Sequence, residues 1–162
     1  MFNQIHQVYF IGIGGIGMSA LARYFKAKGC EVCGYDRTET TLTQNLESEG
    51  IAVHYTDNID AIPQSFKVIK ERVLVVYTPA VPASHREMQW FRNRNYLTMK
   101  RSEVLGLISQ SKKTIAVAGT HGKTSVSTMI AHLLTAADVG CDAFLGGISK
   151  NYNSNLLLSA GR

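Results

Sequence analysis

Short apolar runs and helix-like faces alternate along the first part of the chain. Residues 8–13 read VYFIGI, a continuous apolar run typical of a parallel strand that is buried on both faces. From residue 18 onward, apolar positions recur at the spacing of one helix face. Gly29 follows at the position where a glycine commonly ends a helix. These residues predict a strand followed by a helix.

The same alternation continues to about residue 112. We expect further strands over 31–36, 51–55 and 73–77, helices over 40–50, 84–93 and 101–111, and a short helix or turn at 58–63. A second series follows, with a strand at 114–118 (TIAVA), an amphipathic helix, and strand starts at 141–148 and 155–159. Strand–helix alternation throughout predicts a parallel α/β architecture. The pattern places two domains at 1–112 and 113–162.

Composition and charge narrow the class of protein. The chain has 162 residues, enough for one domain of ordinary size and a piece of another. Its formal net charge is +5, but the basic residues are scattered and form no long block, so we expect no nucleic-acid partner. The first residues contain no basic leader or cleavage site, and their apolar stretch is too short to span a bilayer. We therefore expect no membrane partner.

The cysteines raise the question of a redox or zinc site. Cys30 and Cys33 have C-x-x-C spacing, but residues three apart on a strand face opposite sides. No second Cys/His pair has zinc spacing. We predict free, reduced thiols at these two positions and at Cys141, which fits a cytoplasmic protein.

A glycine-rich turn follows the first predicted strand. Gly12, Gly14 and Gly17 form G-x-G-x-x-G where a helix opens, so backbone N–H groups there can receive a diphosphate. Asp36 ends the second predicted strand, where an acid can accept hydrogen bonds from a ribose. Thr78 begins a loop at the end of another strand, and we expect this loop to border the same crevice, with an ordinary strand–helix connection as the alternative. NAD is the default ligand of this motif, and a glycine turn needed only for packing is the plainer alternative.

A second glycine-rich turn, GTHGKTS, occupies residues 119–125. The usual triphosphate loop, G-x-x-x-x-G-K-[ST], needs a glycine at position 117, where this chain has Val117. The shortened loop still offers backbone N–H groups at a helix start, with Lys123 as a charge for the phosphates of ATP. The Thr124 hydroxyl suits Mg²⁺. His121 is equally well explained as a phosphate contact or as a loop-shaping residue.

The two turns together are more specific than either one. GIGGIGMSALA at 12–22, GYD at 34–36, AVAGTHGKTSVSTM at 116–129 and FLGGISKN at 144–151 closely resemble the Mur ligases of peptidoglycan synthesis. The shortened triphosphate loop resembles that family's own variant. The resemblance implies an α/β fold, with a Rossmann-like parallel sheet domain for a UDP-sugar followed by the start of a P-loop ATPase domain.

The resemblance also implies a reaction. Its best match is with family members that join L-alanine to the muramyl carboxylate of UDP-N-acetylmuramate through an acyl phosphate, with ATP and Mg²⁺. Carried over by position, the UDP-sugar residues would be Gly12, Gly14, Gly15, Ile16, Gly17, Asp36 and Thr78. The ATP residues would be Gly119, Thr120, His121, Gly122, Lys123, Thr124 and Ser125. Lys123 and Thr124 would be catalytic, with Mg²⁺ at Thr124.

Several alternatives remain open. Because the family's metal-binding acid and later domains would follow residue 162, we expect a truncated enzyme that binds but does not ligate. Exposed strands in its incomplete second domain predict either poor order or pairing with another copy, a homodimer. A murein tripeptide-recycling ligase is the nearest sibling. An NAD-dependent oxidoreductase would leave 119–125 unexplained, and a non-catalytic nucleotide-binding module is the remaining alternative.

Overall fold

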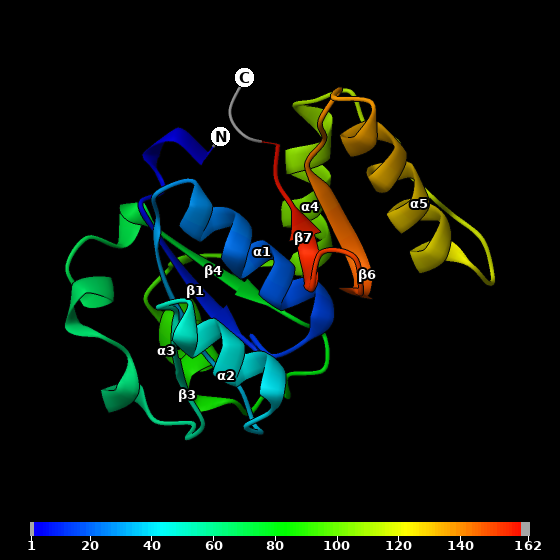
Figure 1. The fold of residues 1–162 in the computed structure, drawn as a ribbon. Coiled ribbons are helices and arrows are strands. Elements are labelled where there is room, and N and C mark those ends of the chain that lie inside the picture. The colour runs from blue at the N-terminus through cyan, green and yellow to red at the C-terminus, as the bar shows by residue number, and fades with distance from the viewer. Residues whose placement is uncertain (1, 160–162) are drawn as a thin grey trace.

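The computed structural model describes residues 2–159 and is built around a five-stranded parallel sheet (Figure 1). The strand order is β3-β2-β1-β4-β5. The strands are β1 (Gln7–Ile11), β2 (Glu31–Tyr35), β3 (Ala52–His54), β4 (Val73–Tyr77) and β5 (Leu97–Lys100). The chain leaves β1 toward β2 on one side and later returns to β4 on the other. The order therefore reverses between β1 and β4, at whose carboxyl ends open α/β sheets bind ligands.

Helices cover both faces of this sheet. They are α1 (Ile16–Ala27), α2 (Thr41–Ser48), α3 (Arg86–Asn93) and α4 (Arg101–Gln110). Short 3₁₀ turns lie at η1 (Phe2–Gln4), η2 (Ile59–Ala61), η3 (Gln64–Lys67) and η4 (Lys70–Arg72). Helices α1, α2 and α4 contribute to the core on one face, whereas α3 packs with residues of the η2–η3 segment on the other.

The two cores arise from the alternation of side chains along each strand. In β1, Val8 and Phe10 enter the core beneath α1, whereas Tyr9 and Ile11 enter the core beneath α3. All four side chains are fully buried. This explains why the strand reads as a continuous apolar run and confirms the expected parallel α/β sheet.

The second part of the chain forms a helix and a hairpin. Helix α5 (Lys123–Ala136) precedes β6 (Ala143–Ser149) and β7 (Ser154–Leu157), which pair antiparallel. The hairpin lies between α1 and α5 (Figure 1), and Phe144 and Leu156 join the core beneath α1. The expectation of parallel strands throughout is wrong here, because only a short turn joins β6 to β7 and parallel neighbours need a long crossover.

Two further strand predictions differ from the structure. Residues 114–118 (TIAVA) form no strand, and Ile115 is 65% exposed. An apolar run becomes a strand only where another strand offers backbone partners, and β6 and β7 use each other. Conversely, strand β5 was missed, because the sequence LTMK carries only a mixed pattern at a sheet edge.

The cysteines agree with the prediction of free thiols. Cys30, Cys33 and Cys141 are free, and burial raises the pKa of each thiol. Within residues 2–159, no helix combines the length and the apolar character needed to cross a membrane.

Candidate nucleotide-binding sites

The first glycine turn leaves the carboxyl end of β1 and opens α1. Gly12 takes a left-handed conformation (φ +87°), and its N–H donates to the Tyr35 carbonyl at 2.8 Å. Ser19 N–H makes the first bond of the helix, to the Gly15 carbonyl at 2.8 Å. The N–H groups of Ile16, Gly17 and Met18 precede this bond, so no helix carbonyl can satisfy them. They form the group that can receive an anion.

Close neighbours explain why side chains are excluded from this turn. A Cβ at Gly12 would lie 2.7 Å from the Thr78 methyl carbon, Cγ2. A Cβ at Gly14 would lie 2.8 Å from both Asp36 Oδ2 and Thr43 Cγ2. The structure thus brings Asp36 and Thr78 to the glycine turn, as the sequence predicted.

Asp36 holds the turn in place. Its Oδ2 accepts a hydrogen bond from Gly14 N–H at 2.6 Å, and its Oδ1 accepts one from Thr38 N–H at 3.2 Å. The sequence indicated a ribose contact for this carboxylate. Its contacts within the chain are with backbone N–H groups, so its first effect is to fix the loop geometry.

Asn155 of β7 joins the hairpin to the first turn of α1. This side chain is fully buried, and its Nδ2 donates to the Ile16 carbonyl at 2.6 Å and to Ser19 Oγ at 2.8 Å. Its Oδ1 accepts from Arg23, which also forms an ion pair with Glu49. Sequence reasoning missed this contact, because nothing local to Asn155 indicates a partner 139 residues away.

A buried polar cluster lies on the opposite face of the sheet, beside the start of α3. Tyr9 Oη donates to Glu87 Oε2 at 2.8 Å and lies 2.7 Å from His54 Nε2. Glu87 is fully buried, and burial raises the pKa of its carboxyl to about 7. Burial also raises the Tyr9 pKa and lowers the His54 pKa. This cluster was not predicted from the sequence.

The same cluster anchors the start of α3. Asp57 accepts hydrogen bonds from the backbone N–H groups of Arg86 and Glu87 at 2.9 and 3.1 Å. His85 Nδ1 lies 3.3 Å from Asp57 Oδ1, and burial lowers the His85 pKa. A carboxylate at the N-terminus of a helix satisfies free N–H groups. Asp57 therefore fixes the end of the loop that begins at Thr78.

The second glycine turn repeats the arrangement at α5. Gly119 and Gly122 have φ values of +148° and +75°, and Gly122 directly precedes the helix. The first helical bond runs from Val126 N–H to the Gly122 carbonyl at 2.9 Å. The N–H groups of Lys123, Thr124 and Ser125 precede it and have no acceptor in the helix. The loop thus offers donors to phosphate oxygens although the preceding strand is absent.

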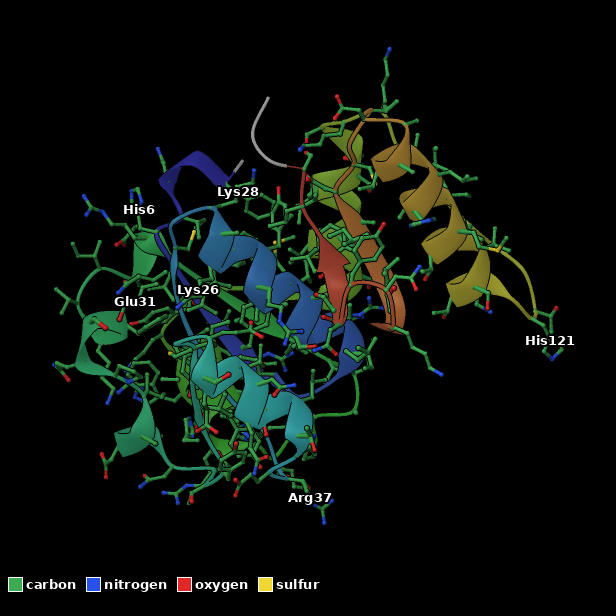
Figure 2. All side chains as sticks on the ribbon, viewed as in Figure 1. His6, Lys26, Lys28, Glu31, Arg37 and His121 are labelled. Atoms are coloured by element: carbon green, nitrogen blue, oxygen red, sulfur yellow. The ribbon has the colours of Figure 1, made fainter. Side chains whose placement is uncertain are left out.

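Lys123 lies over its own loop. Its Nζ donates to the Gly119 carbonyl at 2.7 Å and to the Thr120 carbonyl at 3.2 Å. An ammonium has three donors, so one is left for another acceptor. The whole 119–125 segment is exposed, and Figure 2 shows His121 at its outer tip, directed away from the sheet. This position is compatible with both interpretations of His121, as a phosphate contact and as a loop-shaping residue.

Thr124 faces the hairpin. A Cβ at Gly146 of β6 would lie 2.7 Å from Thr124 Oγ1, and one at Gly147 would lie 3.4 Å from Thr124 Cγ2. The glycine pair therefore lets β6 pass close to the start of α5. A hydroxyl at this helix start is a hard oxygen ligand and fits Mg²⁺ bound together with phosphate oxygens. Within residues 2–159, no group of three or more His, Cys, Asp or Glu residues could hold a metal ion.

Comparisons with known proteins identify the family of this sequence. Residues 7–113 match the family described as "Mur ligase family, catalytic domain". UDP-N-acetylmuramate–L-alanine ligases from Cytophaga hutchinsonii and Porphyromonas gingivalis are 55% and 58% identical over 96% and 94% of this chain. The chain spans about a third of the length of these relatives, 33% of each.

Solved structures give the same fold. A UDP-N-acetylmuramate–alanine ligase from Thermotoga maritima matches 96% of this chain and 35% of its own, with a TM-score of 0.84 and 32% identity. A UDP-N-acetylmuramate:L-alanyl-γ-D-glutamyl-meso-diaminopimelate ligase from Neisseria meningitides matches 95% of this chain and 47% of its own, with a TM-score of 0.83 and 26% identity. Because the family match covers most of the sequence and the fold agrees, the chain belongs to the Mur ligase family.

Proposed function

We propose that this chain supplies the UDP-sugar cradle and the start of the ATP site of an enzyme that joins L-alanine to UDP-N-acetylmuramate. The observation that carries the proposal is the presence of two glycine turns, each at a helix start with three free N–H groups. Two phosphorylated substrates call for two such cradles. The names of the relatives that are 55% and 58% identical support the choice of substrates.

The proposed reaction activates a carboxylate. A muramyl carboxylate oxygen attacks the γ-phosphorus of ATP, which gives an acyl phosphate and ADP. The alanine amine then attacks the acyl carbon, an amide bond forms, inorganic phosphate leaves and the nitrogen loses a proton. A free carboxylate is a poor acyl donor, and the phosphate supplies the missing leaving group.

The chain's own residues contribute binding and charge to this reaction. The turn at Gly12–Gly17 would hold the UDP diphosphate on the N–H groups of α1. The 119–125 loop would hold the ATP phosphates, and the Lys123 ammonium would offset their charge. Thr124 would hold Mg²⁺, which neutralises phosphate charge when it is bound.

We further propose that these 162 residues bind but do not ligate. Thr124 is the single side chain that we assign to the metal, and the described residues contain no cluster of metal-binding groups. The 119–125 loop is exposed along its length, whereas phosphoryl transfer requires that water be excluded. We expect no phosphate release when this chain alone is mixed with ATP, Mg²⁺ and both other substrates.

A chimera tests the reaction. Residues 1–162 would replace the matching third of the Porphyromonas gingivalis relative, which is 58% identical over 153 residues. We expect phosphate release that depends on L-alanine and UDP-N-acetylmuramate, and its loss in Lys123→Met but not in Lys113→Met. Binding of both nucleotides without any amide product, beside an active parent enzyme, would contradict the proposal.

The structural match to the Neisseria protein supports a second candidate, a ligase that uses a preformed peptide. The same chimera separates the two candidates when L-alanine is replaced by L-alanyl-γ-D-glutamyl-meso-diaminopimelate. We expect L-alanine to be the better substrate, because the relatives named for it are more similar to this chain.

A further inference from the structure

The guanidinium of Arg101 lies directly across Gly17. A Cβ at Gly17 would come within 2.7 Å of Arg101 Nη1 and within 3.1 Å of its Cζ and Cδ. Gly17 lies in the first turn of α1, among the N–H groups without helix acceptors. The two residues are far apart in sequence, so this contact results from the fold.

The fold brings Arg101 to this place from the end of β5, an edge strand of the sheet. Strand β5 ends at Lys100, and α4 begins at Arg101. Lys100 N–H donates to Glu103 Oε2 at 2.6 Å, which fixes the first turn of α4. Because parallel strands have their carboxyl ends at one edge, the N-termini of α1 and α4 open at the same edge. Arg101 therefore lies where the proposed diphosphate would bind.

Arg101 has unused hydrogen-bonding capacity. A guanidinium carries five N–H donors in a planar fork. Within residues 2–159, none of the ion pairs or side-chain hydrogen bonds engages Arg101, although its side chain is half-buried. Half-buried arginines normally find an acceptor, since desolvating a charged group without one is unfavourable. The site thus offers a cation that the described part of the chain, residues 2–159, leaves unpaired.

The charge balance of the turn calls for such a cation. The Asp36 carboxylate holds the loop through Gly14 N–H at 2.6 Å, which places a negative charge beside the cradle. A diphosphate bound there would be repelled by that carboxylate. A guanidinium on the other side of the turn would offset the repulsion and could bind two phosphate oxygens at once.

We infer that Arg101 is a diphosphate-binding residue of the UDP-sugar site, and that position 17 is a glycine because the guanidinium must lie across it. The inference rests on the proposed function, since it deepens the same site. It assigns the third glycine of the turn a role in seating a side chain. It also predicts that the contribution of Arg101 to binding depends on the number of phosphates in the uridine ligand.

Calorimetric titration of this chain with UDP, UMP and uridine tests the inference. We expect Arg101→Gln to weaken UDP binding about tenfold or more, because a charge-assisted hydrogen bond is lost, and to leave uridine binding unchanged. Arg101→Lys should bind UDP with an affinity between those of the native chain and Arg101→Gln, since lysine keeps the charge but lacks the planar fork of donors. Arg72 directly precedes β4, at the amino ends of the strands and so away from the glycine turn. Arg72→Gln removes the same charge and should bind UDP as the native chain does.

Gly17→Ala provides a variant that keeps the arginine. The new methyl group would displace the guanidinium, while alanine favours a helix more than glycine does. We expect Gly17→Ala to bind UDP more weakly without losing thermal stability. When Gly17→Ala is combined with Arg101→Gln, UDP affinity should fall little further than in Arg101→Gln alone. A purely structural role for Gly17 would instead lower stability.

The outcomes separate this inference from the proposed function. If the native chain binds UDP and Arg101→Gln binds it equally well, the inference is overturned and the proposed function stands. If the native chain binds no UDP, the proposed function itself fails. Weaker UDP binding by Arg101→Gln, with unchanged uridine binding and unchanged Arg72→Gln, supports the inference.

Discussion

At the scale of single residues, the first glycine turn (Gly12–Gly17, here called the first cradle) depends on the space around its glycines. Gly14 offers its N–H to Asp36 at 2.6 Å, and a Cβ at this position would come within 2.8 Å of the same carboxylate. Gly106, in α4, has nothing within 4 Å of the position where its Cβ would lie. The two glycines thus provide a crowded and an open site for the same substitution.

Gly14→Ala is predicted to weaken UDP binding by about tenfold or more, because the methyl group pushes Asp36 away and the loop loses the hydrogen bond that shapes it. Gly106→Ala should bind UDP normally and gain about 0.5–1 kcal/mol of stability, since alanine favours the helix. Calorimetry and urea unfolding of both variants check the two results. Equal UDP affinities in Gly14→Ala and the native chain would show that the crowding does not matter.

At the scale of elements, Asn155 ties the hairpin to the cradle. It makes hydrogen bonds with Ile16 and Ser19 of α1 and with Arg23 one turn further along. All of its polar atoms are thereby satisfied in a fully buried position. Strand β7, which carries it, is consequently held against the helix that opens the first cradle.

Asn155→Ala is expected to loosen the hairpin. The change leaves the Ile16 carbonyl, Ser19 and Arg23 without this partner, which lowers the stability of the β6–β7 hairpin by about 1–3 kcal/mol. Hydrogen exchange should therefore quicken in residues 143–157 more than in the five-stranded sheet. Asn151→Ala, an exposed residue in the same hairpin, is the matched control. Unchanged protection of the hairpin in Asn155→Ala would rule out this anchoring role.

The buried Glu87 cluster predicts an effect of pH on stability. Burial raises the Glu87 pKa from 4.5 to about 7, so between these values the folded chain holds a proton that the unfolded chain releases. Stability owed to this group therefore falls as pH rises through that window, by up to about 3 kcal/mol. The groups facing Glu87 are the Tyr9 hydroxyl, His54, Asn58 N–H and Asp57.

Glu87→Gln isolates this effect. The lowered pKa values of His54 and His85 act in the opposite sense, since their share of stability is lost as pH falls below 6.5. That share is common to both proteins and largely cancels when they are compared. Urea unfolding from pH 5 to pH 8 should show the native chain losing stability relative to Glu87→Gln. A difference between the two that stays constant with pH would contradict the raised pKa.

Comparison of two apolar runs shows when a sequence pattern is sufficient to predict a strand. The run at 73–77 coincides with β4, because a strand buried on both faces needs apolar side chains at every position. The run at 114–118 misled, because apolar character cannot tell whether a partner strand is present. Arg101 and Asn155 were missed for another reason. Their contacts join segments remote in sequence, and one of them follows a strand whose short, mixed pattern gave no signal.

At the scale of the whole molecule, two cradles open at different places in the fold. The first lies at the carboxyl ends of the strands of the five-stranded sheet, next to β1 and β4, where the strand order reverses. The second begins α5, which stands apart from the sheet beyond the β6–β7 hairpin (Figure 1). Because of this separation, we expect each turn to bind its proposed ligand independently within these 162 residues. The positions of the glycine turns were predictable from sequence, whereas their separation required the fold.

The most direct measurement is calorimetric titration of this chain with UDP-N-acetylmuramate and, separately, with NAD. We predict saturable binding of the UDP-sugar at one site, weakened about tenfold or more in Gly14→Ala, and no binding of NAD over the same concentrations. Saturable binding of NAD, with none of UDP-N-acetylmuramate, would contradict the assignment of the first cradle to a uridine sugar.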